Sequence, residues 1–158
     1  MKNLLILISF TALVSSCGSN SAGEPEVVEE DTVALSYSWK AGLNDSTGEL
    51  EVKKTELGSP DSLTATSMIT FLNTKTPNIQ LQFVKISGDT IYVSIPDALY
   101  LTQQMGSTGP SLYFAETVYN LTEIPGIRFV NFNFEEGDHA APGVLHRGQF
   151  GETKTSSL

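Results

Sequence analysis

Apolar residues alternate with smaller or polar ones along VALSYSW, residues 33–39, and this period of two predicts a β-strand. Turn-forming residues follow at Asn44-Asp45 and Gly48. Residues 49–57 again mix β-favouring residues with polar ones. We therefore expect a second strand there, joined to the first by a turn.

The clearest pattern in the chain is a pair of β-rich runs between residues 78 and 95. They flank Ser87-Gly88-Asp89, and a short glycine-containing turn between two such runs predicts a β-hairpin. Residues 127–134, IRFVNFNF, predict a final strand. Residues 135–158 are rich in Gly, Pro and polar residues, so we expect loops there and a mobile tail over 151–158.

A first helix is predicted over residues 59–73, SPDSLTATSMITFLN. Ser59 has the residue type of an N-cap, and Pro60 is favoured in the first helical turn. The threonines in this segment weaken the helical propensity. The apolar residues that share one face are Leu63, Met68, Ile69 and Leu72.

A second helix is predicted over residues 109–126, with Pro110 near its start and Pro125-Gly126 at its end. Pro125 prevents the helix from continuing, and Gly126 permits a tight exit. One apolar stripe runs along this helix at helical spacing. Its members are Leu112, Phe114, Ala115, Val118, Tyr119, Leu121 and Thr122.

The order of these elements is strand, strand, helix, hairpin, helix, strand. It predicts an α+β fold in one domain over residues 33–150, with a mixed or antiparallel sheet and two helices packed on one of its faces. The other face of the sheet is then partly in contact with water. Polar residues that fit this face are Gln80, Gln82, Asn131 and Asn133.

The N-terminal segment has a different pattern: Lys2 precedes an almost wholly apolar run from Leu4 to Val14. A helix of that length covers roughly 16 Å, about half of a bilayer's hydrocarbon core, which suits the apolar region of a secretory signal. The run ends in Val14-Ser15-Ser16-Cys17, which resembles a bacterial lipobox. The resemblance implies that residues 1–16 are removed and that Cys17 carries acyl chains. The alternative is an ordinary signal peptide with a chance cysteine.

Cys17 is the only cysteine of the 158 residues. Once it is lipidated, the folded part has no thiol for a disulfide, a nucleophile or a metal. Residues 17–32 are acidic and poor in apolar residues, so we expect a flexible tether. Loss of Lys2 would take the formal charge from −9 to about −10, and an acidic chain is a poor partner for nucleic acid. We expect the acyl chains to hold the protein on the bacterial envelope, at the outer membrane.

The segment 79–137 resembles the GerMN domain of spore-germination and other envelope lipoproteins. Residues 118–127, VYNLTEIPGI, match the end of that domain's long helix; Gly88-Asp89 match its tight turn, and Glu136-Gly137 the end of its last strand. The resemblance covers under half of the chain. It implies a non-enzymatic envelope protein that works through protein contacts, in pairing with another envelope protein or by self-association, and it implies no catalytic residues and no cofactor.

One stretch, EEGDHAAPGVLHRG, contains residue types that could take part in catalysis or metal binding. Asp138, His139 and His146, with a carboxylate of Glu135 or Glu136, could ligate a divalent metal, although no H-x-x-x-H spacing is present. In a second interpretation the stretch is a plain loop, in which Asp138 caps a backbone amide and His139 packs on a neighbour. In a third it is a contact surface, with Asp138, His139 and Arg147 as its polar members.

Enzymatic functions find little support in the sequence. No G-x-S-x-G elbow, phosphate-binding loop or dinucleotide fingerprint is present. Five aromatic residues in predicted strands, Tyr37, Trp39, Phe129, Phe132 and Phe134, suit a core better than a sugar-binding platform. We therefore expect a lipid-anchored, non-catalytic envelope protein. The alternative is a module that binds a muropeptide, a glycan or a divalent cation through the Asp138-His139 loop.

Overall fold

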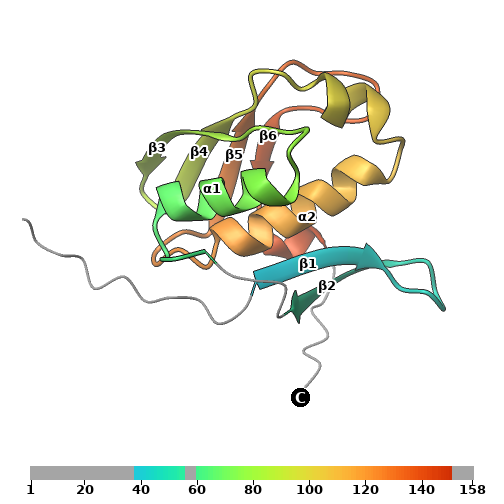
Figure 1. Cartoon of the computed structure of the whole chain (residues 1–158), viewed down its shortest axis with the longest axis horizontal. Helices are drawn as coiled ribbons and strands as arrows, with labels where there is room; N and C mark the ends of the chain where they lie inside the picture. The colour runs from blue at the N-terminus through green and yellow to red at the C-terminus, as the bar shows by residue number, and fades with distance from the viewer. Residues whose placement is uncertain (1–37, 56–59, 151–158) are drawn as a thin grey trace, which may run out of the picture. The chain divides into compact units, whose positions relative to one another are not determined.

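The computed structural model describes residues 38–55 and 60–150, which form two β-sheets and two α-helices (Figure 1). The predicted signal peptide, Cys17, the tether, Ser59 and the tail 151–158 lie outside the described residues. The mixture of helix and strand confirms the α+β class. The division of the strands between two sheets was not predicted. No helix within the described ranges is long and apolar enough to cross a bilayer.

The first sheet is an antiparallel hairpin of β1, Ser38–Leu43, and β2, Leu50–Thr55. The predicted turn joins them, because the Asn44 side-chain oxygen accepts hydrogen bonds from the backbone N–H groups of Ser46 (2.9 Å) and Thr47 (3.1 Å). Gly48 closes the turn at a φ of 70°. Strand β1 extends four residues past Trp39, where the predicted strand ended. Residues 33–37 of that prediction lie outside the described part.

The second sheet has the order β3-β4-β5-β6. Strands β3, Gln82–Ser87, and β4, Thr90–Ser94, form the predicted hairpin around Gly88, and β5, Phe129–Asn133, runs parallel to β4. A parallel neighbour needs a crossover, and the chain between β4 and β5 contains a helix that supplies it. The last strand, β6, Gly143–Leu145, was missed because three residues directly after a proline carry no strand pattern.

Helix α1, Ala65–Lys75, begins six residues after Ser59, so the predicted N-cap was wrong. Thr64 caps it instead, since its hydroxyl accepts from the backbone N–H of Ser67 (3.3 Å). The Ser62 hydroxyl donates to the Ser67 hydroxyl (2.8 Å) and ties the preceding turn to the helix. The buried residues of the helix are Met68, Ile69 and Leu72, as the apolar pattern predicted.

Helix α2, Gly109–Leu121, has Pro110 in its first turn as predicted, but it ends four residues before Pro125. Gly126 lies in the turn beyond, at a φ of 82°. The helix is buried almost all round and not along one stripe. The reason is its position between the two sheets (Figure 1). Ala115 and Tyr119 pack on the β1–β2 hairpin, whereas other α2 residues belong to the core against the four-stranded sheet.

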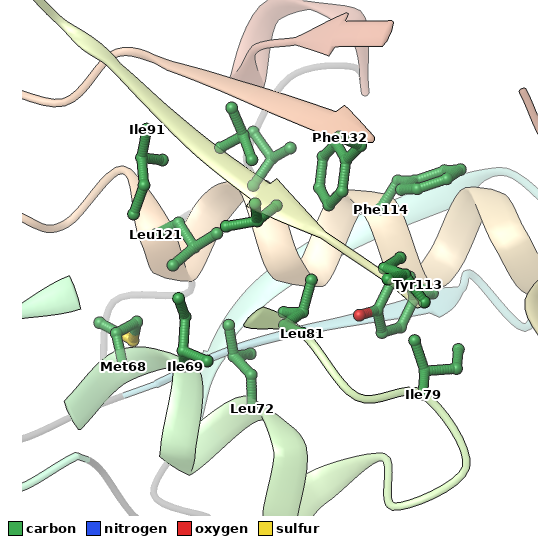
Figure 2. Close-up of a cluster of buried hydrophobic side chains, with 14 of the residues drawn as sticks. Met68, Ile69, Leu72, Ile79, Leu81, Ile91, Tyr113, Phe114, Leu121 and Phe132 are labelled. Carbon is green, nitrogen blue, oxygen red and sulfur yellow. The ribbon is translucent and has the colours of Figure 1, made fainter. Parts of the chain in front are cut away.

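The main core lies between the helices and one face of the β3–β6 sheet. Figure 2 shows side chains of α1, α2 and the strands meeting there, with Ile91 and Phe132 from the sheet and Leu121 from α2. The opposite face of the sheet carries Gln82 and Asn133, which are exposed, and Asn131, which is half-buried. This arrangement agrees with the prediction of one dry and one partly wet face.

Candidate functional site

The Asp138-His139 loop follows β5 and is a tight turn against η1, the single π-helical turn Tyr100–Gln104. The backbone N–H of Gly137 donates to the carbonyl of Ala140 (3.0 Å), and that of His139 donates to the carbonyl of Thr102 (3.0 Å). A Cβ atom on Gly137 would lie 2.6 Å from the Cβ of Thr102, so only glycine allows this approach. The turn is therefore fixed by backbone contacts.

The two polar side chains of this loop point outward. Asp138 and His139 are exposed. With the Gln103 amide oriented so that its nitrogen faces Asp138, that nitrogen donates to the Asp138 carboxylate (2.9 Å) and the amide oxygen accepts from the Asp138 N–H (3.2 Å). The loop thus has a defined shape, which fits both the plain-loop and the contact-surface interpretations.

Arg147 has entirely different surroundings, at the C-terminal end of α2. Its Nε donates to the Thr122 hydroxyl (2.6 Å), and its Nη2 donates to the Tyr119 carbonyl (2.8 Å) and to the Glu123 carboxylate. The guanidinium also lies 4.9 Å from the Tyr119 ring centroid and 5.3 Å from that of Trp39. Because its donors are engaged in these contacts, Arg147 holds the structure together and is not grouped with the Asp138-His139 loop.

The same end of α2 holds strand β1 in place. Buried Asn120 accepts from the Trp39 N–H (3.0 Å) and donates to the carbonyls of Trp39 (2.9 Å) and Glu116 (2.8 Å). The Trp39 indole N–H donates to Glu123 (2.9 Å), and Lys54 lies 5.1 Å from the indole ring. Polar side chains of the helix end therefore bind both the first strand and the last turn.

These roles were missed by sequence reasoning, which assigned the segment around LTEIPG only a helix-ending role. The available signal was the pair of polar residues Asn120 and Glu123, on either side of the apolar stripe's last members, Leu121 and Thr122. A buried polar side chain needs a partner, so Asn120 and Glu123 indicated distant contacts. Their partners could not be identified, because Trp39 and Arg147 lie far away in the chain.

Metal binding at the loop has no geometric support. The part of the chain that the structure describes contains no group of three or more His, Cys, Asp or Glu side chains that could hold a metal ion. His146 lies instead with its ring 5.7 Å from that of Phe129, in an edge-on contact. The predicted cluster of Asp138, His139 and His146 does not form, because His146 belongs to the turn beside Arg147.

Glu116 is a half-buried acidic residue of α2 that lines two small hollows, of about 170 Å³ and 260 Å³. Its carboxylate accepts from the Ala41 N–H (3.2 Å), and burial raises the pKa of Glu116 above its usual value. Both hollows are smaller than the roughly 300 Å³ of ordinary ligand pockets. We therefore assign Glu116 to the contact between α2 and β1.

Strand β3 is the most exposed regular element of the described part. All six of its residues are exposed, and three are large and apolar: Phe83 (46 % exposed), Val84 (53 %) and Ile86 (44 %). Three more large apolar residues are exposed, but they lie apart in the chain: Leu43 on β1, Leu99 just before η1, and Val144 on β6. In a sheet that begins with β3, the outer edge of this strand pairs with no other strand among the described residues.

Comparison with protein-family models, with curated proteins and with solved structures gave no match. The resemblance to the GerMN domain and to a lipobox therefore stays a prediction from the sequence.

Proposed function

We propose that this chain is a lipid-anchored protein of the bacterial cell envelope that acts through protein contact and not through catalysis. The anchor would be Cys17, because the segment before it has the pattern of a lipoprotein signal. Residues 17–32 would then separate the folded part from the membrane. A chain of formal charge −9 is repelled by anionic headgroups, so the acyl chains supply the membrane affinity.

One observation carries the proposed contact function: the exposed, apolar edge strand β3. An unpaired strand edge presents backbone N–H and C=O groups that can extend the sheet with another strand. Proteins usually cover such an edge or blunt it with charge or a bulge, and β3 carries one lysine, Lys85, and one register shift, at Val84. Three large apolar side chains in the row of six nevertheless stay exposed, and a protein partner that covers them explains this exposure best.

The alternative function, binding of a metal or a small ligand through the Asp138-His139 loop, has weaker support. The loop side chains are exposed, and the described residues offer them no third ligand. The two hollows beside Glu116 lie on other elements and are small. A contact surface formed by Asp138 and His139 would be compatible with the proposed contact function. Arg147 would not belong to it.

Photo-crosslinking in membranes tests the proposal. A photoreactive residue would replace Phe83 in the full chain, and the matched control would replace Leu43, which is equally exposed at 46 % on a different sheet. We expect a protein adduct from position 83 and little from position 43. Absence of any adduct from position 83, in a chain that is folded and membrane-bound, would contradict the contact function.

A further inference from the structure

The partner of β3 can be inferred from the arrangement of its own side chains. Phe83 and Ile86 point to the same face of the sheet, because their partners in β4 are Val93 and Ile91, which are both buried on the helix side. A register shift between Phe83 and Lys85 inserts Val84 as an extra residue. This bulge gives the two apolar residues a spacing of three on one face.

That spacing makes the strand complementary to itself. In an antiparallel pair of two β3 strands, centred between Val84 and Lys85, Phe83 lies opposite Ile86 of the second copy, and Ile86 lies opposite its Phe83. The polar ends also match, since Gln82 lies opposite Ser87. Lys85 lies opposite Val84, so the two like charges do not face each other directly. A two-fold contact requires such self-complementarity.

We propose that the partner of β3 is a second copy of this chain, paired antiparallel through β3 in this register. The inference rests on the proposed function, since it names the occupant of the same surface. It joins the two four-stranded sheets into one continuous sheet across the two-fold axis. The exposed side chains of Phe83 and Ile86 in one copy then cover those of Ile86 and Phe83 in the other.

Charge favours this edge over the rest of the surface. The chain has a formal charge of −9, so two copies repel each other in most orientations. Strand β3 contains no acidic residue, and the Nζ of its Lys85 lies 4.8 Å from the Tyr92 ring centroid, on the opposite face from Phe83. The acidic residue of the adjoining turn, Asp89, is already paired with Arg128. Two copies can therefore approach here without juxtaposed carboxylates.

The small size of the contact determines whether the dimer forms in free solution or only on a membrane. Pairing of one short edge strand covers less than the roughly 1,600 Å² of an ordinary stable interface, so the dimer is weak in free solution. Anchoring both copies in one membrane raises their effective concentration and favours pairing. The test therefore uses the full chain in its own membrane.

Charge-swap rescue tests the register directly. Two differently tagged full-length copies are produced together, crosslinked in the membrane with a short reagent, and one tag is isolated while the other is measured. Phe83→Lys or Ile86→Glu in both copies should lower co-isolation by about tenfold, corresponding to about 1.4 kcal/mol. One copy with Phe83→Lys and one with Ile86→Glu should recover it, because the two introduced, opposite charges then face each other across the axis.

Controls separate pairing from folding and from crowding in the membrane. Leu43→Lys in both copies alters an equally exposed residue on the other sheet and should leave co-isolation unchanged. Thermal melting should show every variant as stable as the unchanged chain. Absence of co-isolation for the unchanged chain, or failure of the mixed pair to recover it, would overturn the proposal.

The photo-crosslinking experiment distinguishes this inference from the proposed function. An adduct from position 83 whose mass equals two copies of this chain supports both. An adduct with a different protein, and none with itself, overturns the dimer and leaves the contact function standing. No adduct from position 83 overturns both.

Discussion

Trp39 and Arg147 donate hydrogen bonds to the same oxygen of the Glu123 carboxylate, from opposite ends of the described chain. The guanidinium of Arg147 also lies 5.3 Å from the centroid of the Trp39 indole. Strand β1 and the last turn are thus fixed to one point at the end of α2. The contact explains how a hairpin outside the four-stranded sheet keeps its place on the helix.

A substitution of Asn120 is the simplest test of how α2 holds strand β1. Asn120→Leu would leave the backbone N–H and C=O of Trp39 without their partners, in a position that is fully buried. An unsatisfied buried group costs about 1–3 kcal/mol, so we expect the free energy of unfolding to fall by at least that amount. Urea denaturation measures the loss, and amide exchange at Trp39 should become faster.

Asn133→Leu is the matched control, because Asn133 is exposed on the outer face of the sheet. A surface change of this kind usually alters stability by less than about 0.5 kcal/mol. Equal losses for the two variants would show that the Asn120–Trp39 hydrogen bonds do not hold the hairpin.

We expect the stabilisation that ionised Glu123 provides to be lost at acid pH. Burial alone would raise the pKa of Glu123, but hydrogen bonds from Arg147 and Trp39 outweigh it and hold the pKa below the usual 4.5. The folded state then binds fewer protons than the unfolded state, so the stabilisation is present above pH 4.5 and is lost as the pH falls through the lowered pKa. Glu123→Gln should be less stable than the unchanged chain at neutral pH, and the gap should narrow below pH 4.5.

The contribution of Glu116 to the free energy of unfolding should depend on pH in the opposite sense. Glu116 therefore serves as the internal comparison. Burial raises the pKa of Glu116, so the folded state holds this proton more tightly than the unfolded state. The associated stability is present at low pH and is lost as the pH rises from 4.5 through the raised pKa. Glu116→Gln should therefore gain stability relative to the unchanged chain as the pH rises. Urea midpoints measured between about pH 3 and pH 8 would contradict both assignments if the two variants changed in the same direction.

Gly126 should resist replacement because of its backbone and not because of its neighbours. Its φ is 82°, yet a Cβ atom added there would meet nothing within 4 Å. Gly126→Val should lower the free energy of unfolding by about 1 kcal/mol or more, whereas Gly126→Asn should cost less. Gly143→Val, at an equally open site with ordinary φ, is the control. Unchanged melting of Gly126→Val would refute the conformational explanation.

Local patterns predicted the regular elements better than they predicted the contacts between them. The turn at Asn44 and Gly48 and the hairpin at Gly88 were found because those residues suit few other conformations. The start of α1 was misplaced because several capping residues compete between Ser59 and Thr64, and the hydrogen bond to Ser67 decides among them. Nothing in the pattern indicated that a hairpin would cover the outer side of α2.

The candidate sites show the same limit. Asp138 and His139 were correctly placed in a loop, since Gly137 and Pro142-Gly143 surround them. Arg147 was grouped with them because it follows nearby in the sequence, but its partners are Glu123 and Trp39. Exposure of β3 could not be predicted either, because its apolar residues resemble those of a buried strand. Only the edge position of β3 in the sheet distinguishes them.

Cys17 provides a prediction that concerns the anchor alone. Cys17→Ala should accumulate as an unprocessed precursor that lacks acyl chains and is readily extracted from membranes. Ser16→Ala keeps a small residue before the cysteine and should be processed normally. Mass spectrometry of the N-terminal peptide decides, and an unmodified thiol on the mature unchanged chain would refute the lipobox interpretation.

The central claim is that the folded part works through the exposed edge strand β3. Partner binding by a membrane-anchored variant of this strand tests the claim most directly. Phe83→Glu and Leu43→Glu change two residues that are each 46 % exposed, so membranes that contain either variant should hold equal amounts of folded chain. After crosslinking, we predict that Phe83→Glu loses the adducts of the unchanged chain and that Leu43→Glu keeps them. Equal adducts for both variants would contradict the account.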